Sequence, residues 1–206
     1  MRLLLFGATG RTGACALAAA LAAGHEVSVF VRDPARLGAT AAGLGVVRGD
    51  VLDAAAVLSA MPGHEAVLST LGGGVQQGSA LSTGTRNIVS AMEHSGVRRI
   101  VAIVGAGVLQ GDEQRLRSEL PDYPPRFAAI SAEHRAAYDA LRKSTLDWTL
   151  VCTPNLPEGL ATGQFRVADS YLPEGGRSIS TADTAAFLVA QLTRADFSRR
   201  RVGIAY

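Results

Sequence analysis

The sequence predicts an α/β protein in which a doubly wound parallel β-sheet is covered by helices on both faces. Short apolar stretches typical of strands alternate with longer stretches that have the spacing of helices. The strand-like stretches are apolar throughout, which is typical of parallel strands buried on both faces. A glycine or a polar or charged residue stands close after each of them. Ligands of such sheets bind beyond the carboxyl ends of the strands, so we expect one crevice to collect these residues.

The first predicted strand and helix surround a glycine-rich turn. An apolar strand over residues 3–6 leads into the turn at residues 7–13, and an alanine-rich helix follows over residues 14–23. Gly7 and Gly10 permit positive φ values and let a ligand approach the bare backbone. The helix directs its unpaired N–H groups and the positive end of its dipole at that ligand. The spacing G-x-x-G-x-x-G therefore predicts a diphosphate-binding turn.

The later elements continue the alternation of strands and helices. Further strands are expected at residues 26–31, 45–51, 65–70, 99–104, 148–152 and 201–205. Helices are expected at residues 35–37, 53–59, 82–94, 127–143 and 181–192, with caps at Asp53 and at Ser180 or Thr181, and with Gly96 as a stop. The proline-bearing stretch 111–125 is irregular and too long for a simple connection.

Composition limits the range of functions. The chain has 206 residues and a net charge of +2, with basic residues scattered along it. It is therefore expected to form one domain over residues 1–206 and to bind no nucleic acid. Its two cysteines, Cys15 and Cys152, lie in apolar stretches without a clustered partner, so we expect free thiols and no metal site. No stretch approaches the ~18 apolar residues of a membrane span, and we expect a cytoplasmic protein.

The end of the second predicted strand bears on the choice of dinucleotide. NAD-dependent enzymes usually place a carboxylate there, whereas a 2′-phosphate favours arginine. Arg32 stands at this position, with Arg11 in the glycine turn and Arg36 one helical turn further on, which favours NADPH. Two alternatives remain open: Arg36 is only a solvated helix residue, or Asp33 binds the ribose.

Two more strand ends extend the predicted cofactor site. Asp50, after the third strand, is placed to accept from the adenine amino group, with Val51 against the ring. The alternative for Asp50 is a helix cap. Leu71 and Gly72 follow the fourth strand, where glycine would leave clearance for the ribose and diphosphate.

The chain resembles the flavin reductase and biliverdin-IXβ reductase family, atypical members of the short-chain dehydrogenase/reductase superfamily. The resemblance rests on the motifs at residues 6–13, 31–37, 49–52, 86–92, 124–126 and 134–142. It implies a single Rossmann domain, hydride transfer to a flat conjugated acceptor such as a flavin, a quinone or a linear tetrapyrrole, and NADPH as cofactor. We expect a monomer or a weak homodimer. The residues expected to bind the cofactor are Gly7, Thr9, Gly10, Arg11, Thr12, Arg32, Arg36, Asp50, Val51, Leu71, Gly72, Gly105 and Pro154.

The sequence also departs from relatives in the superfamily. The tyrosine and lysine of the Y-x-x-x-K pair are absent, because Arg142 follows Tyr138 at that spacing and Lys143 is displaced by one residue. One residue turns a helical side chain by ~100°, so Lys143 cannot substitute. Relative to the biliverdin reductases, a serine, a bulky residue and a histidine are replaced by Gly105, Gly107 and Asn155.

Asn155 and His134 remain as the candidate catalytic residues. Asn155 could donate to a carbonyl or to the nicotinamide carboxamide, and His134 titrates near neutrality if it is unperturbed. A structural contact on a helix face is the alternative role for His134, and Tyr138, one turn later, is equally ambiguous. Two other functions are possible from the sequence: an NmrA-like NAD(P)-sensing regulator without turnover and, more weakly supported, a sugar-nucleotide epimerase or dehydratase.

Overall fold

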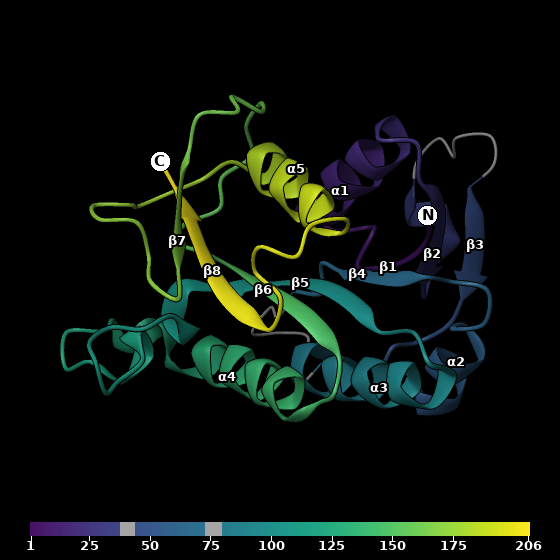
Figure 1. Cartoon of the computed structure of the whole chain (residues 1–206), viewed down its shortest axis with the longest axis horizontal. Coiled ribbons are helices and arrows are strands. Elements are labelled where there is room, and N and C mark those ends of the chain that lie inside the picture. The colour runs from purple at the N-terminus through teal and green to yellow at the C-terminus, as the bar shows by residue number, and fades with distance from the viewer. Residues whose placement is uncertain (38–43, 73–79) are drawn as a thin grey trace.

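The computed structural model describes residues 1–37, 44–72 and 80–206. An eight-stranded sheet forms the middle layer, with α1 and α5 on one face and α2, α3 and α4 on the other (Figure 1). The α-helices are α1 (Arg11–Ala22), α2 (Ala54–Ser59), α3 (Ala80–Ser95), α4 (Ala128–Lys143) and α5 (Thr181–Gln191). The strands are β1 (Arg2–Phe6), β2 (Glu26–Val31), β3 (Gly45–Arg48), β4 (Ala66–Ser69), β5 (Arg99–Gly105), β6 (Asp147–Thr153), β7 (Arg166–Asp169) and β8 (Arg200–Ala205).

The strand order, β3-β2-β1-β4-β5-β6-β8-β7, confirms the predicted doubly wound sheet. All neighbouring strands pair in parallel except β7 and β8, which pair antiparallel. The strands run outward from β1 through β2 to β3, and the chain then crosses back to β4 on the other side of β1, so the strand order reverses between β1 and β4. This is the topological switch point at which dinucleotides bind in such folds.

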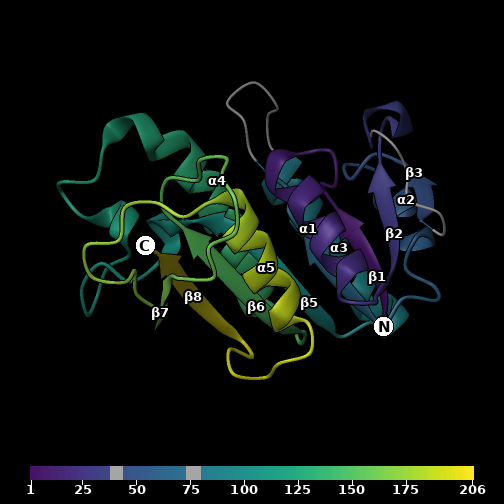
Figure 2. The same ribbon diagram turned by 90° about the horizontal axis from the view of Figure 1, so that it is seen from above.

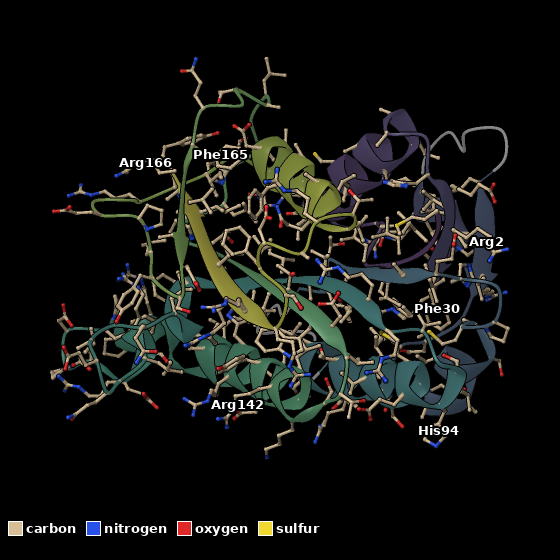
Figure 3. All side chains as sticks on the ribbon, viewed as in Figure 1. Arg2, Phe30, His94, Arg142, Phe165 and Arg166 are labelled. Atoms are coloured by element: carbon tan, nitrogen blue, oxygen red, sulfur yellow. The ribbon has the colours of Figure 1, made fainter. Side chains whose placement is uncertain are left out.

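Each face of the sheet buries its own apolar core. The α2, α3 and α4 face contains Phe6 and Phe30, whose ring centroids lie 5.0 Å apart, and Figure 3 shows Phe30 pointing into this layer. On the opposite face, α1 and α5 lie side by side (Figure 2) and cover Leu3, Leu5 and their neighbours. Figure 3 also shows Arg142 on the outer surface of α4. Burial of alternate strand residues on opposite faces accounts for the uniformly apolar strands.

The observed element boundaries differ from the expected ones where glycine governs the backbone. Helix α1 begins at Arg11, three residues before its expected start, because Gly10 is extended and serves as its N-cap. Gly13 lies inside the helix, where a side chain would collide with the carbonyl of Gly7. Strand β3 ends at Arg48, before the expected residue 51; the Gly49 N–H still donates to the Val31 carbonyl at 3.0 Å, and a turn follows at residues 51–52. After the fourth strand the sequence also predicts a glycine stop at residues 73 and 74 and a polar loop at residues 76–79, and these residues lie outside the described ones.

Strand β7 has no counterpart among the predicted elements. Its four residues are mostly exposed, so they form no continuous apolar stretch that would predict a buried strand. The segment 111–125 is irregular as expected, with short 3₁₀ turns at Arg117–Glu119 and Pro125–Phe127. Of the helices within the described ranges, none has the length and apolar character needed to cross a membrane.

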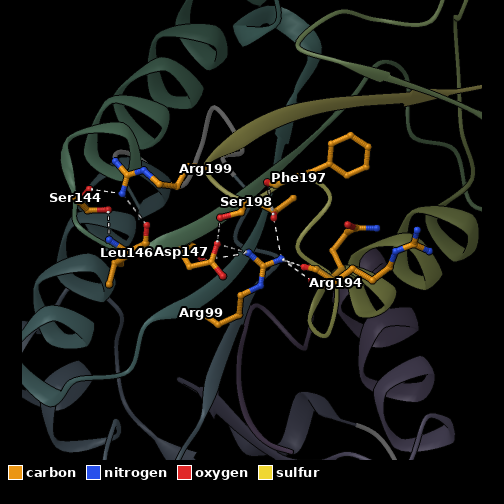
Figure 4. A network of polar contacts seen from close by, with 10 residues as sticks. Arg99, Ser144, Leu146, Asp147, Arg194, Phe197, Ser198 and Arg199 are labelled. Atoms are coloured by element: carbon orange, nitrogen blue, oxygen red, sulfur yellow. Dashed lines mark hydrogen bonds and ion pairs between the residues drawn. The ribbon is translucent and has the colours of Figure 1, made fainter.

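A polar network closes the amino-terminal end of β5 and β6 (Figure 4). Arg99 pairs with Asp147 at 3.2 Å and donates to the hydroxyl of Thr149 at 2.8 Å and to the carbonyl of Gln191. Ser198 donates to the same Asp147 carboxylate at 2.6 Å. The network therefore ties β5, β6, the end of α5 and the start of β8 together, at the opposite end of the sheet from the switch point.

Candidate active site

A cavity of about 550 Å³ opens at the carboxyl ends of β1, β2, β4, β5 and β6. Every residue predicted to bind the cofactor lines it, and so does His134. Eleven further residues line the cavity without having been predicted from the sequence: Phe6, Phe30, Val31, Gly49, Thr70, Ala80, Ile103, Val104, Ile130, Thr153 and Leu156. Most of these are residues at or next to the predicted strand ends. Ile130 lies on α4 and has no local sequence signal of this kind.

The glycine turn after β1 presents bare helix N–H groups to the cavity. Gly7 has a φ of +85°, and its carbonyl accepts a hydrogen bond from the N–H of Gly10 at 3.0 Å. The N-cap of α1, Gly10, offers no side-chain acceptor, and the first turn holds no acidic residue. By contrast, Asp53 caps α2 and Ser180 caps α5. The first turn of α1 is therefore free to bind an anionic ligand.

Two of the three predicted arginines meet at a second, smaller cavity. Arg32 and Arg36, together with Thr9 and Asp33, line this space of about 310 Å³. Both guanidinium groups are exposed, and the described part of the chain places no carboxylate within ion-pairing distance of either. One carboxylate oxygen of Asp33 accepts from the N–H of Ala35 at 3.1 Å.

Arg11 lies apart from this pair. It lines the larger cavity but not the smaller one, and its Nε atom lies 3.9 Å from the carboxylate of Glu158 in the loop after β6. Both side chains of this ion pair are mostly exposed, so it contributes little stability. The structure thus groups Arg32 with Arg36, while Arg11 stands at the helix terminus.

The wall formed by Asp50, Val51 and Leu71 is held by α3. The Val51 carbonyl accepts from the Asn87 side chain at 2.8 Å. A Cβ added to Gly84 would lie 2.9 Å from a methyl of Val51 and 3.1 Å from one of Leu71, so glycine permits this close packing. One oxygen of Asp50 accepts from the Leu52 N–H at 3.0 Å, whereas the α2 cap is Asp53.

His134 and Gly105 form a contact between α4 and the end of β5. The Gly105 N–H donates to Nδ1 of His134 at 3.2 Å. A Cβ on Gly105 would lie 2.8 Å from that nitrogen, so the imidazole occupies the space of the missing side chain. Burial lowers the pKa of His134 to about 4, although the nearby Glu133 carboxylate opposes this shift. The imidazole is therefore neutral at pH 7.

The absence of a side chain at Gly107 leaves space for a second polar pair, which the sequence did not predict. The hydroxyls of Tyr123 and Ser131 lie 2.7 Å apart, and a Cβ on Gly107 would lie 2.8 Å from the Tyr123 oxygen. No local pattern predicts this pair, because Tyr123 lies in the irregular segment and Ser131 on α4. Gly105 at the end of β5 and Gly107 just after it thus accommodate polar groups from α4 and from the preceding loop.

Asn155 and Tyr138 are not brought into the cavity. Asn155 is exposed, is absent from the described lining, and pairs through its backbone with Arg177 and Ile179 at 3.3 and 3.0 Å. Its predicted catalytic role therefore gains no support from this arrangement. Tyr138 packs edge-on against Trp148, with ring centroids 6.0 Å apart, and Arg201 lies 4.8 Å from its ring.

The strand order, the uncapped glycine turn and the cavity at the switch point define a nucleotide-binding Rossmann-fold protein. A family of proteins described as NAD(P)H-binding matches residues 7–195. The chain belongs to this NAD(P)H-binding family.

Several solved structures share the fold over the whole chain. A protein from Burkholderia pseudomallei, described as a candidate exported protein, is 29% identical, covers 100% of both chains and has a TM-score of 0.87. A protein from Streptococcus pneumoniae TIGR4, proposed to be an NADH-flavin reductase, is 23% identical over 100% of this chain and 99% of its own, with a TM-score of 0.86. ChuY, an anaerobillin reductase from Escherichia coli O157:H7, is 24% identical over 100% and 97%, with a TM-score of 0.81. At 23% and 24% identity, the similarity to the last two proteins shows a shared fold only.

Proposed function

We propose that this protein is an NADPH-dependent reductase of flat conjugated acceptors such as flavins, quinones or linear tetrapyrroles. The observation that carries the proposal is the pair Arg32 and Arg36, which share a cavity beside the nucleotide-binding turn and have no ion-pair partner in the described residues. Two guanidinium groups in this position suit a ribose 2′-phosphate. The fold shared with the anaerobillin reductase ChuY and with the proposed NADH-flavin reductase from Streptococcus pneumoniae supports the reaction class.

The residues of the cavity fit a dinucleotide along its length. The first turn of α1, with Thr9, Gly10 and Thr12, would hold the diphosphate, and Arg11 would add a positive charge there. Asp50 would accept from the adenine amino group through its second oxygen, with Val51 against the ring. A bound NADPH would supply hydride to the acceptor. Gly105 and Pro154 would border the nicotinamide at the ends of β5 and β6.

The acceptor half of the cavity favours planar apolar molecules. Ile103, Val104, Ile130 and Leu156 line it beside Thr153. Tyr138 is partly buried and packs against the core, and no phenol and lysine pair serves as a proton donor among the described lining residues. Reduced flavins and quinones take their proton from water, so apolar walls that orient the ring would suffice.

Replacement of Arg32 tests the choice of cofactor. Arg32→Ala should weaken NADPH binding by about 10-fold or more, because a charge-assisted contact to the 2′-phosphate is lost, and should leave NADH binding nearly unchanged. Titration of the protein with each cofactor, monitored by nicotinamide fluorescence, measures both affinities. Arg142→Ala, on the outer face of α4, is the matched control. Equal weakening of NADPH and NADH would contradict the phosphate assignment.

An NAD(P)-sensing regulator of the NmrA kind is the second candidate. The absence of Asn155 from the described cavity lining favours it, since the acceptor half then holds few polar groups. Mixing the protein with NADPH and with riboflavin, FMN or a quinone distinguishes the two by the loss of NADPH absorbance. Turnover supports the reductase, whereas tight NADPH binding without turnover over these acceptors would favour the sensor.

A further inference from the structure

The contact between Gly105 and His134 fixes the tautomer of the imidazole. The donor is the backbone N–H of Gly105, so Nδ1 must carry a lone pair and the ring proton must reside on Nε2. A Cβ at position 105 would lie 2.8 Å from both Nδ1 and Cε1 of the ring. The ring can therefore approach this N–H only because residue 105 is glycine.

The second ring nitrogen, Nε2, is available to a ligand. It has no hydrogen-bond partner among the described residues. It is also absent from the set of fully buried side-chain atoms that lack a partner, so it is accessible. His134 lines the cavity on the side of Gly105 and Thr153, where β5 and β6 end. The Nε2–H of this cavity-lining residue is therefore placed to reach a ligand in the cavity.

The surroundings of His134 keep this donor neutral. Burial is the largest influence on its pKa, which falls to about 4. Glu133, on the same helix, opposes this shift, and its carboxylate also accepts from the Ser82 N–H on α3 at 3.2 Å. The Tyr123 hydroxyl is bound to Ser131, and α1 brings Arg11 to the same cavity. The lining residues of β5 and β6 are not titratable.

We propose that His134 binds a ring carbonyl of the acceptor through its Nε2–H as a neutral hydrogen-bond donor, and that it keeps its proton throughout the reaction. The inference rests on the proposed reductase function and narrows its substrates to carbonyl-bearing rings such as quinones and flavins. A bound NADPH would supply a hydride, and with it two electrons, to the acceptor ring. The carbonyl oxygen takes up the displaced electron pair, His134 stabilises that charge, and water supplies the proton.

Nitrogen NMR of the protein tests the tautomer without any turnover. Long-range proton–nitrogen spectra should show His134 with a protonated Nε2 and a bare Nδ1, unchanged between about pH 5 and pH 8. The chain has four histidines, and the signals that vanish in His134→Gln identify the right one. A proton on Nδ1, or titration of His134 near pH 6.5, would overturn the proposal.

Kinetics of three variants test the donor. His134→Ala should lower kcat/KM for a quinone on the order of 100-fold, as expected for the loss of one donor to a developing oxyanion, with NADPH affinity unchanged. His134→Gln should recover most of this loss, because its amide nitrogen can reach the position of Nε2. His94→Gln, on the exposed surface of α3, is the control for histidine replacement elsewhere.

The pH dependence and a double variant complete the test. Wild-type kcat/KM should stay flat from about pH 5 to pH 8, whereas a general acid would impose a fall through its own pKa.

Gly105→Ala should displace the ring and cause a loss of kcat/KM similar to that of His134→Ala. In the double variant the two losses should not add. Additive losses, or an equal defect in His134→Gln and His134→Ala, would contradict the proposal. Failure of the wild type to bind NADPH or to reduce any acceptor would instead refute the reductase function, while the NMR result would still stand.

Discussion

Individual glycines have distinct physical roles around the cavity. Gly7 provides a positive φ, Gly13 admits a carbonyl into the first turn of α1, and Gly84 lets α3 approach Val51 and Leu71. Gly105 makes room for an imidazole from another element. Only the first of these roles depends on backbone conformation, and the others depend on what packs against the missing side chain.

Replacement of Gly7 separates these two effects. A Cβ on Gly7 would lie 2.6 Å from the Thr70 carbonyl oxygen, whereas Gly24 has a similar φ of +78° with open space around it. Gly24→Ala should cost about 1 kcal/mol for the left-handed backbone. Gly7→Ala should cost roughly 2 kcal/mol or more beyond that, because β1 and β4 must move apart. Urea denaturation of both variants measures the difference, and equal losses would refute the steric argument.

At the scale of elements, Asp183 holds the loop after β6 against α5. Its buried carboxylate accepts from the N–H groups of Thr162 and Gly163 at 2.8 to 3.0 Å and from the Tyr206 hydroxyl at 2.7 Å. The Ser180 hydroxyl, which caps α5, lies 3.3 Å away. One side chain therefore joins the loop bordering the cavity, the start of α5 and residue 206.

This cluster predicts a loss of stability in acid. Burial raises the pKa of Asp183, but the hydrogen bonds from Tyr206, Thr162 and Gly163 outweigh it and lower the pKa to about 2. An unfolded aspartate titrates near 3.9, so the stabilisation is complete above about pH 4 and is lost as the pH falls towards 2.

Asp183→Asn tests this linkage. The variant should be less stable at pH 7, by about 3 kcal/mol, because buried donors lose their charged acceptor. Its stability should also vary less between about pH 4 and pH 2 than that of the wild type. Urea midpoints over this range provide the measurement, with Asp53→Asn at the α2 cap as control. An unchanged pH dependence in Asp183→Asn would assign the acid sensitivity to other groups.

For the whole molecule, the two ends of the sheet separate ligand binding from stabilisation. The cavity lies beyond the carboxyl ends of the strands, while the Arg99 network closes the amino-terminal end of β5 and β6 (Figure 4). Arg99 begins β5 and Gly105 ends it. Strand β5 therefore connects the Arg99 network to the cavity, but the two sites have no polar side chain in common.

Arg99→Ala should therefore affect stability alone. Loss of the partly buried guanidinium leaves the Asp147 carboxylate and the Gln191 carbonyl without their partner, which should cost about 2–4 kcal/mol. NADPH affinity, measured well below the lowered melting temperature, should stay within about twofold of the wild type. Arg32→Ala should show the opposite pattern, a loss of affinity with little change in melting temperature. Weakened NADPH binding in Arg99→Ala would show that the two ends are coupled.

The sequence by itself determined the doubly wound sheet and the residues at the strand ends that line the cavity. Apolar strands, helical spacing and glycines are local signals, since each reports on the conformation or burial of a few neighbouring residues. Parallel strands then bring their carboxyl ends to one edge, so Thr9, Arg32, Asp50 and Gly72 could be placed together before any contact was known.

Only the tertiary structure decided which side chains from α4 reach the end of β5 and how the surrounding loops are anchored. The meeting of Gly105 with His134, and of Asp183 with Tyr206, joins residues on separate elements. Strand β7 pairs at an exposed edge, and Asn155 is not among the described residues that line the cavity although it follows a strand end. These contacts depend on how distant segments pack, because the free energy that fixes them comes from burial and hydrogen bonds across the fold. No local pattern of residues encodes them.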